Sequence, residues 1–197
     1  MTSLVELIFN CNLKTTLGHI ASIQTGVFAK PASKGEIVYL QARFFDENGL
    51  LIGELHPDLL ADDINEKHLL KLGDVLFAAK GNKNFAAVFE DRYPKSVAST
   101  SFFVIRLRDN TTLPEYFAWF MNSPTTQLFL KSTALGSSIA SISKSVLEKL
   151  EMLVPDIQTQ RVILEISRLR SQEKKMRQKI ESLQEIIIQK KINNAIK

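Results

Sequence analysis

The sequence predicts an α+β fold, in which a β-rich domain with short helices precedes a long C-terminal coiled-coil helix. Short runs of Val, Ile and Phe between Gly18 and Phe103 are separated by Gly, Asn, Pro and Asp, which is typical of strands joined by turns. Helical spacing follows, and after Pro155 apolar residues repeat as in a coiled coil. We therefore expect a domain of residues 1–156 and a helix of residues 157–197.

Four segments carry the strand signal in the first part of the chain. They are EIVYLQA at 36–42, DVLFAAK at 74–80, FAAVFED at 85–91 and SFFVIRL at 101–107. Val, Ile and Phe favour strands because branched and aromatic side chains pack well on a pleated surface. Residues 1–16 match no pattern and stay unassigned, as an arm, a strand partner or an extension of the start.

The middle of the chain predicts helices. Pro114 and Pro124 each suit the first turn of a helix, and Ser123 can cap the second one. Gly136 can end that helix in a left-handed conformation, and Ser145 begins a possible capping box before a strand-like LEMLVP segment. Three apolar residues recur at helical spacing and are expected in the core: Phe117, Phe120 and Met121.

The C-terminal segment has the pattern of a helix that seeks a helical partner. No Gly or Pro occurs after Pro155, and apolar residues alternate in steps of four and three, with Glu173 as the one polar occupant. These seam residues are Val162, Ile166, Leu169, Met176, Ile180, Leu183 and Ile187. The alternative is an amphipathic helix that lies back on its own domain.

The charge is divided unevenly along the chain. The net charge is +4, but residues 157–197 hold ten basic and four acidic residues, which leaves 15 basic and 17 acidic residues before them. Seven acidic residues between Asp46 and Glu66 occur without Lys or Arg, so we expect that stretch to face away from any phosphate backbone. A single cysteine and the lack of an apolar run of about 20 residues favour a cytoplasmic protein without a membrane span.

Signatures of catalysis and of cofactor binding fail on inspection. His19, His56, His68 and Cys11 show no metal-ligand spacing, and no glycine-rich phosphate loop is present. The NSPT segment at Asn122 lacks the second proline and the aromatic residue of an amino-methyltransferase motif. A nuclease-like Glu and Lys pair two residues apart, at 173 and 175, falls in the predicted helix and diverges by about 200°. We therefore expect no enzyme activity, no metal and no cofactor.

Six segments in sequence order carry a family resemblance. They are LGHIASIQTGVFAKP, YLQARFFDENG, LLKLGDVLFAAKGNKNFAAVF, SVASTSFFVIRL, LPEYFAWFMNSPTTQLFL and GSSIASISKSVLEKLEMLVPDIQTQ, followed by the long helix. In this order they resemble a target-recognition domain of type I restriction-modification specificity subunits. The resemblance implies a non-catalytic subunit that reads double-stranded DNA and positions methyltransferase (modification) and restriction subunits on a bipartite site.

The same resemblance implies an oligomer. A full-length specificity chain in this family contains two recognition domains and two long helices, whereas this chain has one of each and no internal repeat. It resembles a half-subunit, so we expect a homodimer through an antiparallel coiled coil, with a different half-subunit as an alternative partner. Two other hypotheses stay open: a coiled-coil interaction scaffold with a β-rich binding domain, and a recognition module acting in trans with a single-chain enzyme.

Several loop residues are candidates for DNA contacts. The first choice is the AKGNKNF turn, where Lys and Asn side chains suit phosphates, guanine and adenine, although a polar hairpin turn would use the same residues. The candidates in this turn are Lys80, Gly81, Asn82, Lys83 and Asn84. The other candidates are Lys30, Ser33 and Lys34 on a loop, Gln41 and Arg43 on one face of a continuing strand, and Ser137 and Ser138 near a helix end. Gln41 and Arg43 could instead pair with the acidic stretch.

Overall fold

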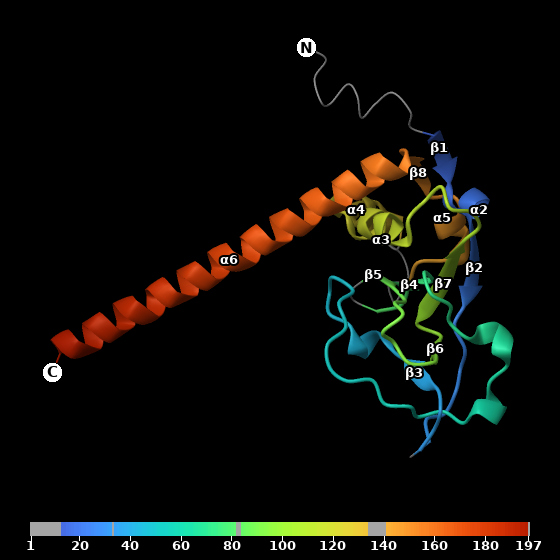
Figure 1. The fold of residues 1–197 in the computed structure, drawn as a ribbon, viewed down its shortest axis with the longest axis horizontal. Helices are drawn as coiled ribbons and strands as arrows, with labels where there is room; N and C mark the ends of the chain where they lie inside the picture. The colour runs from blue at the N-terminus through green and yellow to red at the C-terminus, as the bar shows by residue number, and fades with distance from the viewer. Residues whose placement is uncertain (1–12, 33, 82–83, 134–140, 197) are drawn as a thin grey trace, which may run out of the picture. The chain divides into compact units, whose positions relative to one another are not determined.

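The computed structural model describes residues 13–32, 34–81, 84–133 and 141–196 (Figure 1). Its strands and short helices precede one long helix, which confirms the predicted α+β class. Two compact units are distinguished, residues 1–160 and 161–197, and each is described by itself.

The main sheet of the first unit has four antiparallel strands in the order β2-β7-β4-β5. Its strands are β2 (Ala21–Thr25), β7 (Phe102–Leu107), β4 (Val75–Ala78) and β5 (Ala86–Val88). Three of the predicted strand segments thus contribute to this sheet. All four residues of β4 are buried, because the strand lies in the interior of the sheet between β7 and β5.

Two smaller strand pairs complete the β-structure. Strand β1 (Leu13–Thr16) pairs antiparallel with β8 (Glu151–Val154), so the end of the unassigned N-terminal segment is a strand partner. Strand β3 (Val38–Leu40), which the first predicted segment supplies, pairs parallel with β6 (Ser96–Ala98). Both pairs join residues that are far apart in the sequence, and the β1–β8 pair holds the two ends of the first unit together.

The helices begin largely where the sequence places them. They are α2 (Leu17–Ile20), α3 (Pro114–Asn122), α4 (Pro124–Thr133) and α5 (Lys144–Glu148), with 3-10 turns η1 (Ala42–Phe44), η2 (Ala61–Asp63) and η3 (Glu66–His68). The Ser123 hydroxyl accepts a hydrogen bond from the Thr126 amide at 3.3 Å, as expected of a cap. Helix α5, however, is capped by Ser143 rather than Ser145, because the chain turns into the helix two residues earlier. Gly136 lies outside the described residues.

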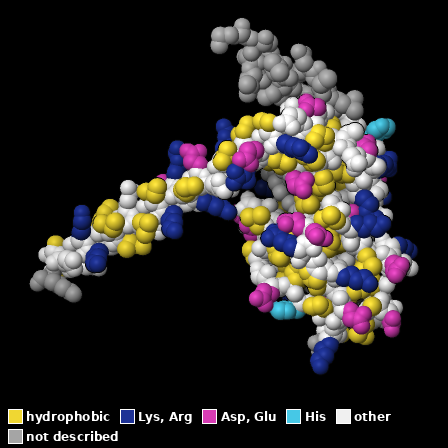
Figure 2. All heavy atoms as spheres, viewed as in Figure 1, with side chains coloured by type: hydrophobic (Ala, Val, Ile, Leu, Met, Phe, Trp, Pro, Cys, Tyr) yellow, Lys and Arg dark blue, Asp and Glu magenta, His cyan; other side chains and the backbone are white. Residues whose placement is uncertain are grey.

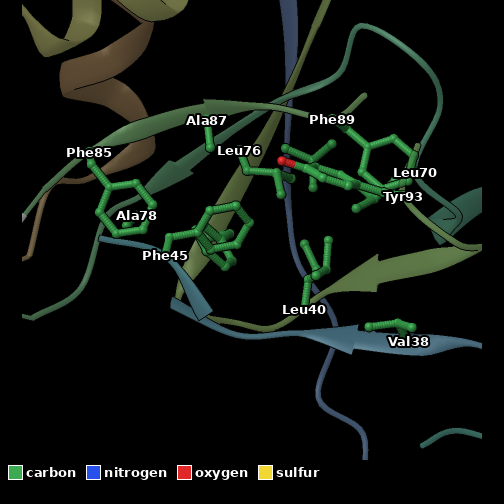
Figure 3. Packing of buried hydrophobic residues seen from close by; sticks show 13 residues of the cluster. Val38, Leu40, Phe45, Leu70, Leu76, Ala78, Phe85, Ala87, Phe89 and Tyr93 are labelled. Carbon is green, nitrogen blue, oxygen red and sulfur yellow. The ribbon is translucent and has the colours of Figure 1, made fainter. Parts of the chain in front are cut away.

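The core of the first unit is built on aromatic side chains (Figure 3). The rings of Phe45, Phe85 and Phe102 pack with centroids 5.7 to 6.0 Å apart, which adds to the stability gained from burial. A second, smaller cluster of Ile37, Tyr39, Leu59 and Val97 lies around β3 and β6. Among the expected core residues of α3, Phe117 and Met121 are fully buried, whereas Phe120 is half-buried.

Helix α6 (Ile157–Ala195) contains 39 residues and is about 58 Å long at about 1.5 Å per residue. The seven apolar seam residues are between 42% and 62% exposed in the single chain. About half of the surface of each residue therefore faces solvent. Figure 2 shows hydrophobic side chains along this helix, with Lys and Arg side chains around them. None of the helices in the described ranges is both long and apolar enough to cross a membrane.

Candidate nucleic-acid interface

One end of the four-stranded sheet collects the loops that carry most of the predicted contacts. Strands β2 and β4 both run antiparallel to β7, with Thr25 opposite Phe103 and Ala78 opposite Phe102. The loop after β2 and the turn after β4 therefore leave the sheet at the same end, where β7 begins. We call this end of the sheet the loop end.

Backbone hydrogen bonds to residues 98–101 tie three segments together at the loop end. The Val27 amide donates to the Ala98 carbonyl at 2.8 Å, and the Ser99 amide donates to the Leu40 carbonyl at 2.8 Å. The Ala79 amide donates to the Ser101 carbonyl at 3.0 Å. The structure thus brings the segments that follow Thr25, Leu40 and Ala78 to one place, although they are distant in sequence.

Strands β4 and β5 pair antiparallel, so the segment that joins them is a hairpin connection. Lys80 is exposed and forms a β-bridge with Ser141, and Ile142 donates to the Ala79 carbonyl at 2.9 Å. Gly81 has φ +115°, and no atom of the described chain lies within 4 Å of where a Cβ would stand. This backbone conformation favours glycine, because a side chain would be strained there.

Asn84 supports the turn from within. Its side-chain nitrogen donates to the Ala78 carbonyl at 2.8 Å, and the residue is half-buried. One amide hydrogen is thus used by the turn itself, which leaves Asn84 less suited to a paired contact with adenine than the sequence suggests. Asn82 and Lys83 lie outside the described residues.

A hollow of about 590 Å³ lies beside the turn. Its lining residues are Ala42, Phe45, Asp46, Glu47, Asn48, Lys80, Gly81 and Phe85. Asp46 and Glu47 therefore share the hollow with Lys80, so these two residues of the acidic stretch lie beside the turn chosen first for DNA contacts. The Asp46 carboxylate accepts hydrogen bonds from the Asn48 and Leu50 amides, both at 2.8 Å, so it also shapes its own loop.

Gln41 and Arg43 do not share a strand face. Strand β3 ends at Leu40, and the next residues form η1, a turn in which each residue rotates by about 120°. Gln41 is half-buried, whereas Arg43 is exposed with its guanidinium 5.1 Å from the centre of the Phe44 ring. The prediction that both project together is therefore wrong, because the chain leaves the strand immediately before Gln41.

The remaining predicted residues are distributed as follows. Lys30 and Lys34 are exposed on the loop after β2 but do not line the hollow. That loop is held to the 58–59 segment, since Ala32 donates to the Asp58 carbonyl at 2.7 Å and Glu36 donates to the Leu59 carbonyl at 2.9 Å. Ser33, Ser137 and Ser138 lie outside the described residues. In the part of the chain that the structure describes, no group of three or more His, Cys, Asp or Glu residues could hold a metal ion.

Two residues at the loop end were missed by sequence reasoning. Asn48 lines the hollow, and Phe28 is 78% exposed in the loop after β2. Val27, Phe28 and Ala29 are all apolar, so the sequence offers no alternation that marks Phe28, and only the structure shows it exposed between two half-buried residues. Asn48 gives no sequence signal either, since Asn is common in turns for local reasons.

Comparison with known proteins places the chain in a family. Residues 15–185 match the type I restriction modification DNA specificity domain. The chain belongs to this family. No curated protein sequence matches it.

Solved structures of type I systems have a similar fold. One structure, from a study of complex assembly and conformational transition of the type I R-M system, has a TM-score of 0.62 at 14% identity, and the match covers 83% of this chain and 39% of that chain. The S subunit from M. genitalium has a TM-score of 0.57 at 17% identity, and the match covers 87% of this chain and 42% of that subunit. The HsdS subunit from Thermoanaerobacter tengcongensis has a TM-score of 0.57 at 14% identity, and the match covers 84% of this chain and 38% of that subunit. The specificity domain described here therefore spans about two fifths of the length of these chains.

Proposed function

We propose that this specificity domain reads double-stranded DNA at the loop end of its main sheet, without catalysing a reaction itself. The observation that carries the proposal is the family match over residues 15–185, on a domain whose loops converge at one end. Loops on a rigid sheet suit base reading, because side chains from several segments reach the edges of neighbouring base pairs. We further propose that the domain positions methyltransferase and restriction subunits on a bipartite DNA site.

The distribution of charge supports binding through local contacts to DNA, and not through a general attraction between the whole domain and DNA. Four exposed basic residues lie on the segments that follow β2, β3 and β4, namely Lys30, Lys34, Arg43 and Lys80. Residues 1–156 nevertheless contain 15 basic and 17 acidic residues, so the domain as a whole does not attract a polyanion. Tight binding is therefore expected of the assembled complex, with the lone chain binding weakly and best at low salt.

We also propose that α6 pairs with α6 of a second copy, antiparallel. With Glu173 included, the seam residues are separated by steps that read the same in both directions. Antiparallel pairing about the point between residues 174 and 175 therefore places Val162 opposite the partner's Ile187 and Leu169 opposite the partner's Ile180. A parallel pair in register would place Glu173 against the same carboxylate of its partner, which costs stability.

DNA recognition can be tested by methylation mapping in the host. Deleting the gene for this chain should abolish adenine methylation at one interrupted sequence motif, and a wild-type copy should restore it. An unchanged methylation pattern would contradict the proposal.

A second experiment measures DNA binding in vitro. Lys80→Ala should lower the slope of the logarithm of the binding constant against the logarithm of the salt concentration by about 0.9, the value for one phosphate contact. Lys67→Ala on η3, also exposed, is the matched control and should leave the slope unchanged.

The dimer can be tested by cross-linking in a Cys11→Ser background, where engineered thiols are the only ones. A mixture of Ile166→Cys and Leu183→Cys chains should form disulfide-linked dimers, since these residues lie opposite each other in the antiparallel pair. Either variant cross-linking to itself alone would instead indicate parallel pairing. A monomer at micromolar concentration in sedimentation analysis would contradict the dimer.

A further inference from the structure

Phe28 is the most exposed aromatic side chain of the described residues, at 78%. It lies at the loop end of the sheet, directly after Val27, whose amide is bonded to Ala98. An exposed phenyl ring leaves a large apolar area in water. No contact among the described residues explains why this ring is exposed. Such a ring suits a contact surface better than a structural position.

The backbone holds Phe28 outward from both sides. The buried Tyr39 hydroxyl donates to the Val27 carbonyl at 3.0 Å and accepts from the Ala29 amide at 3.4 Å. Val27 and Ala29 are partly buried against the second core cluster. The two neighbours are thus anchored while the ring between them projects, so presenting Phe28 to a ligand costs little further ordering.

The charged residues nearest to Phe28 along the chain are both positive. The segment alternates, with Val27 and Ala29 half-buried and Phe28 and Lys30 exposed, so the ring and the ammonium lie on the same side of an extended chain. Lys30 and Lys34 are the charged residues between Gly26 and Gly35. The neighbouring Asp58 carboxylate accepts from the Tyr39 amide at 2.7 Å, so one of its oxygens is bound within the domain.

We propose that Phe28 is an apolar anchor for duplex DNA, packing against the bases while Lys30 neutralises an adjacent phosphate. An aromatic ring flanked by cations suits a groove in which thymine methyl groups offer apolar contacts among the base edges and the phosphates on both rims are anionic. This inference rests on the proposed DNA-binding function and adds a contact that the basic residues alone do not provide. Apolar packing and phosphate neutralisation differ in their dependence on salt, which makes the two contributions separable.

The test uses the full chain, purified with the subunits that accompany it in its host, and a fluorescein-labelled duplex of random sequence at low salt. Phe28→Ala should weaken binding about tenfold or more, as expected when the apolar contact of one phenyl ring is lost, with the salt slope unchanged. Lys30→Ala should instead lower the slope by about 0.9. Phe28→Trp should retain affinity, because the larger ring can make the same contact.

Leu72→Ala is the matched control. Leu72 is 70% exposed and precedes β4, at the opposite end of the sheet from Phe28, so its truncation should leave binding unchanged. Equal thermal unfolding of all variants shows that the domain stays intact. Unchanged DNA binding by Phe28→Ala would overturn this inference. The same conclusion would hold if the variant complex had lost an accompanying subunit and still bound DNA like the wild type. A wild-type complex that binds no duplex would overturn the proposed function and this inference together.

Discussion

The side-chain amide of Asn122 pairs with both backbone groups of Ala86. Its Oδ1 accepts from the Ala86 amide and its Nδ2 donates to the Ala86 carbonyl, both at 2.8 Å. Strand β5 is an edge strand, and this pair acts as one residue of an additional strand. Gly49 approaches the same carbonyl so closely that a Cβ there would stand 2.3 Å from it. The hairpin beside the hollow is thus fixed from α3 and from the 46–50 loop.

Replacing Asn122 by Ala should lower the free energy of unfolding by about 2 kcal/mol, because a buried amide and a buried carbonyl lose their partner. Asn122→Asp should be at least as harmful, since a carboxylate cannot donate to the Ala86 carbonyl. Urea denaturation measures both. Asn110→Ala, at an exposed position, should change stability by less than about 0.5 kcal/mol. Equal losses at the two sites would refute the role given to Asn122.

Asp74→Asn should also destabilise the domain. The Arg106 guanidinium donates to both oxygens of the buried Asp74 carboxylate, at 2.7 and 2.6 Å, and the Lys71 amide donates at 2.8 Å. The hydrogen bond to Asp74 raises the pKa of Arg106, so the guanidinium stays charged at neutral pH. An amide would turn a donor toward these donors, at a cost of about 2 kcal/mol. Asp91→Asn, on an exposed turn, is the control and should unfold at the wild-type urea concentration.

The strands and the long helix were predictable because their signals are local. The Val, Ile and Phe runs mark β3, β4, β5 and β7, and the lack of Gly or Pro after Pro155 marks α6. Strands β1, β2 and β6 were not singled out. They are three to five residues long, and β1 and β6 are fixed by partners far away in the sequence.

The candidate site was less predictable, because it depends on which loops meet. Lys80 and Lys30 were identified from residue type and turn context, but no local pattern indicates that Asp46 lies in the same hollow as Lys80. Arg43 was assigned to the wrong geometry, because the transition from strand to 3-10 turn at Gln41 has no strong sequence signal. Asn122 was considered only as part of a failed motif, since its partner Ala86 is 36 residues away.

The start of α6 gives a prediction for pH. The Thr159 amide and hydroxyl donate to the Asp156 carboxylate at 3.0 and 2.7 Å, and these bonds hold the pKa of Asp156 below its ordinary value of 3.8. A lowered pKa means that the stabilisation is present above pH 3.8 and is lost as the pH falls through the lower, folded-state value. Wild type should therefore exceed Asp156→Asn in thermal stability at pH 6, and the difference should vanish in acid. A difference that grows toward low pH would contradict this sign.

Gln160 anchors the first turns of α6 to the rest of its unit. The side chain is fully buried; its Oε1 accepts from the Leu113 amide at 2.8 Å, and its Nε2 donates to the Thr111 and Pro155 carbonyls at 2.7 Å. Gln160→Leu keeps the size of the side chain but removes every one of these bonds, so we expect a loss of about 3 kcal/mol in the free energy of unfolding. Gln178→Leu, exposed on the same helix, should be nearly neutral. Hydrogen exchange adds a local measure, because the Leu113 amide should exchange faster in Gln160→Leu than in wild type, and unchanged exchange there would show that Gln160 does not hold this segment.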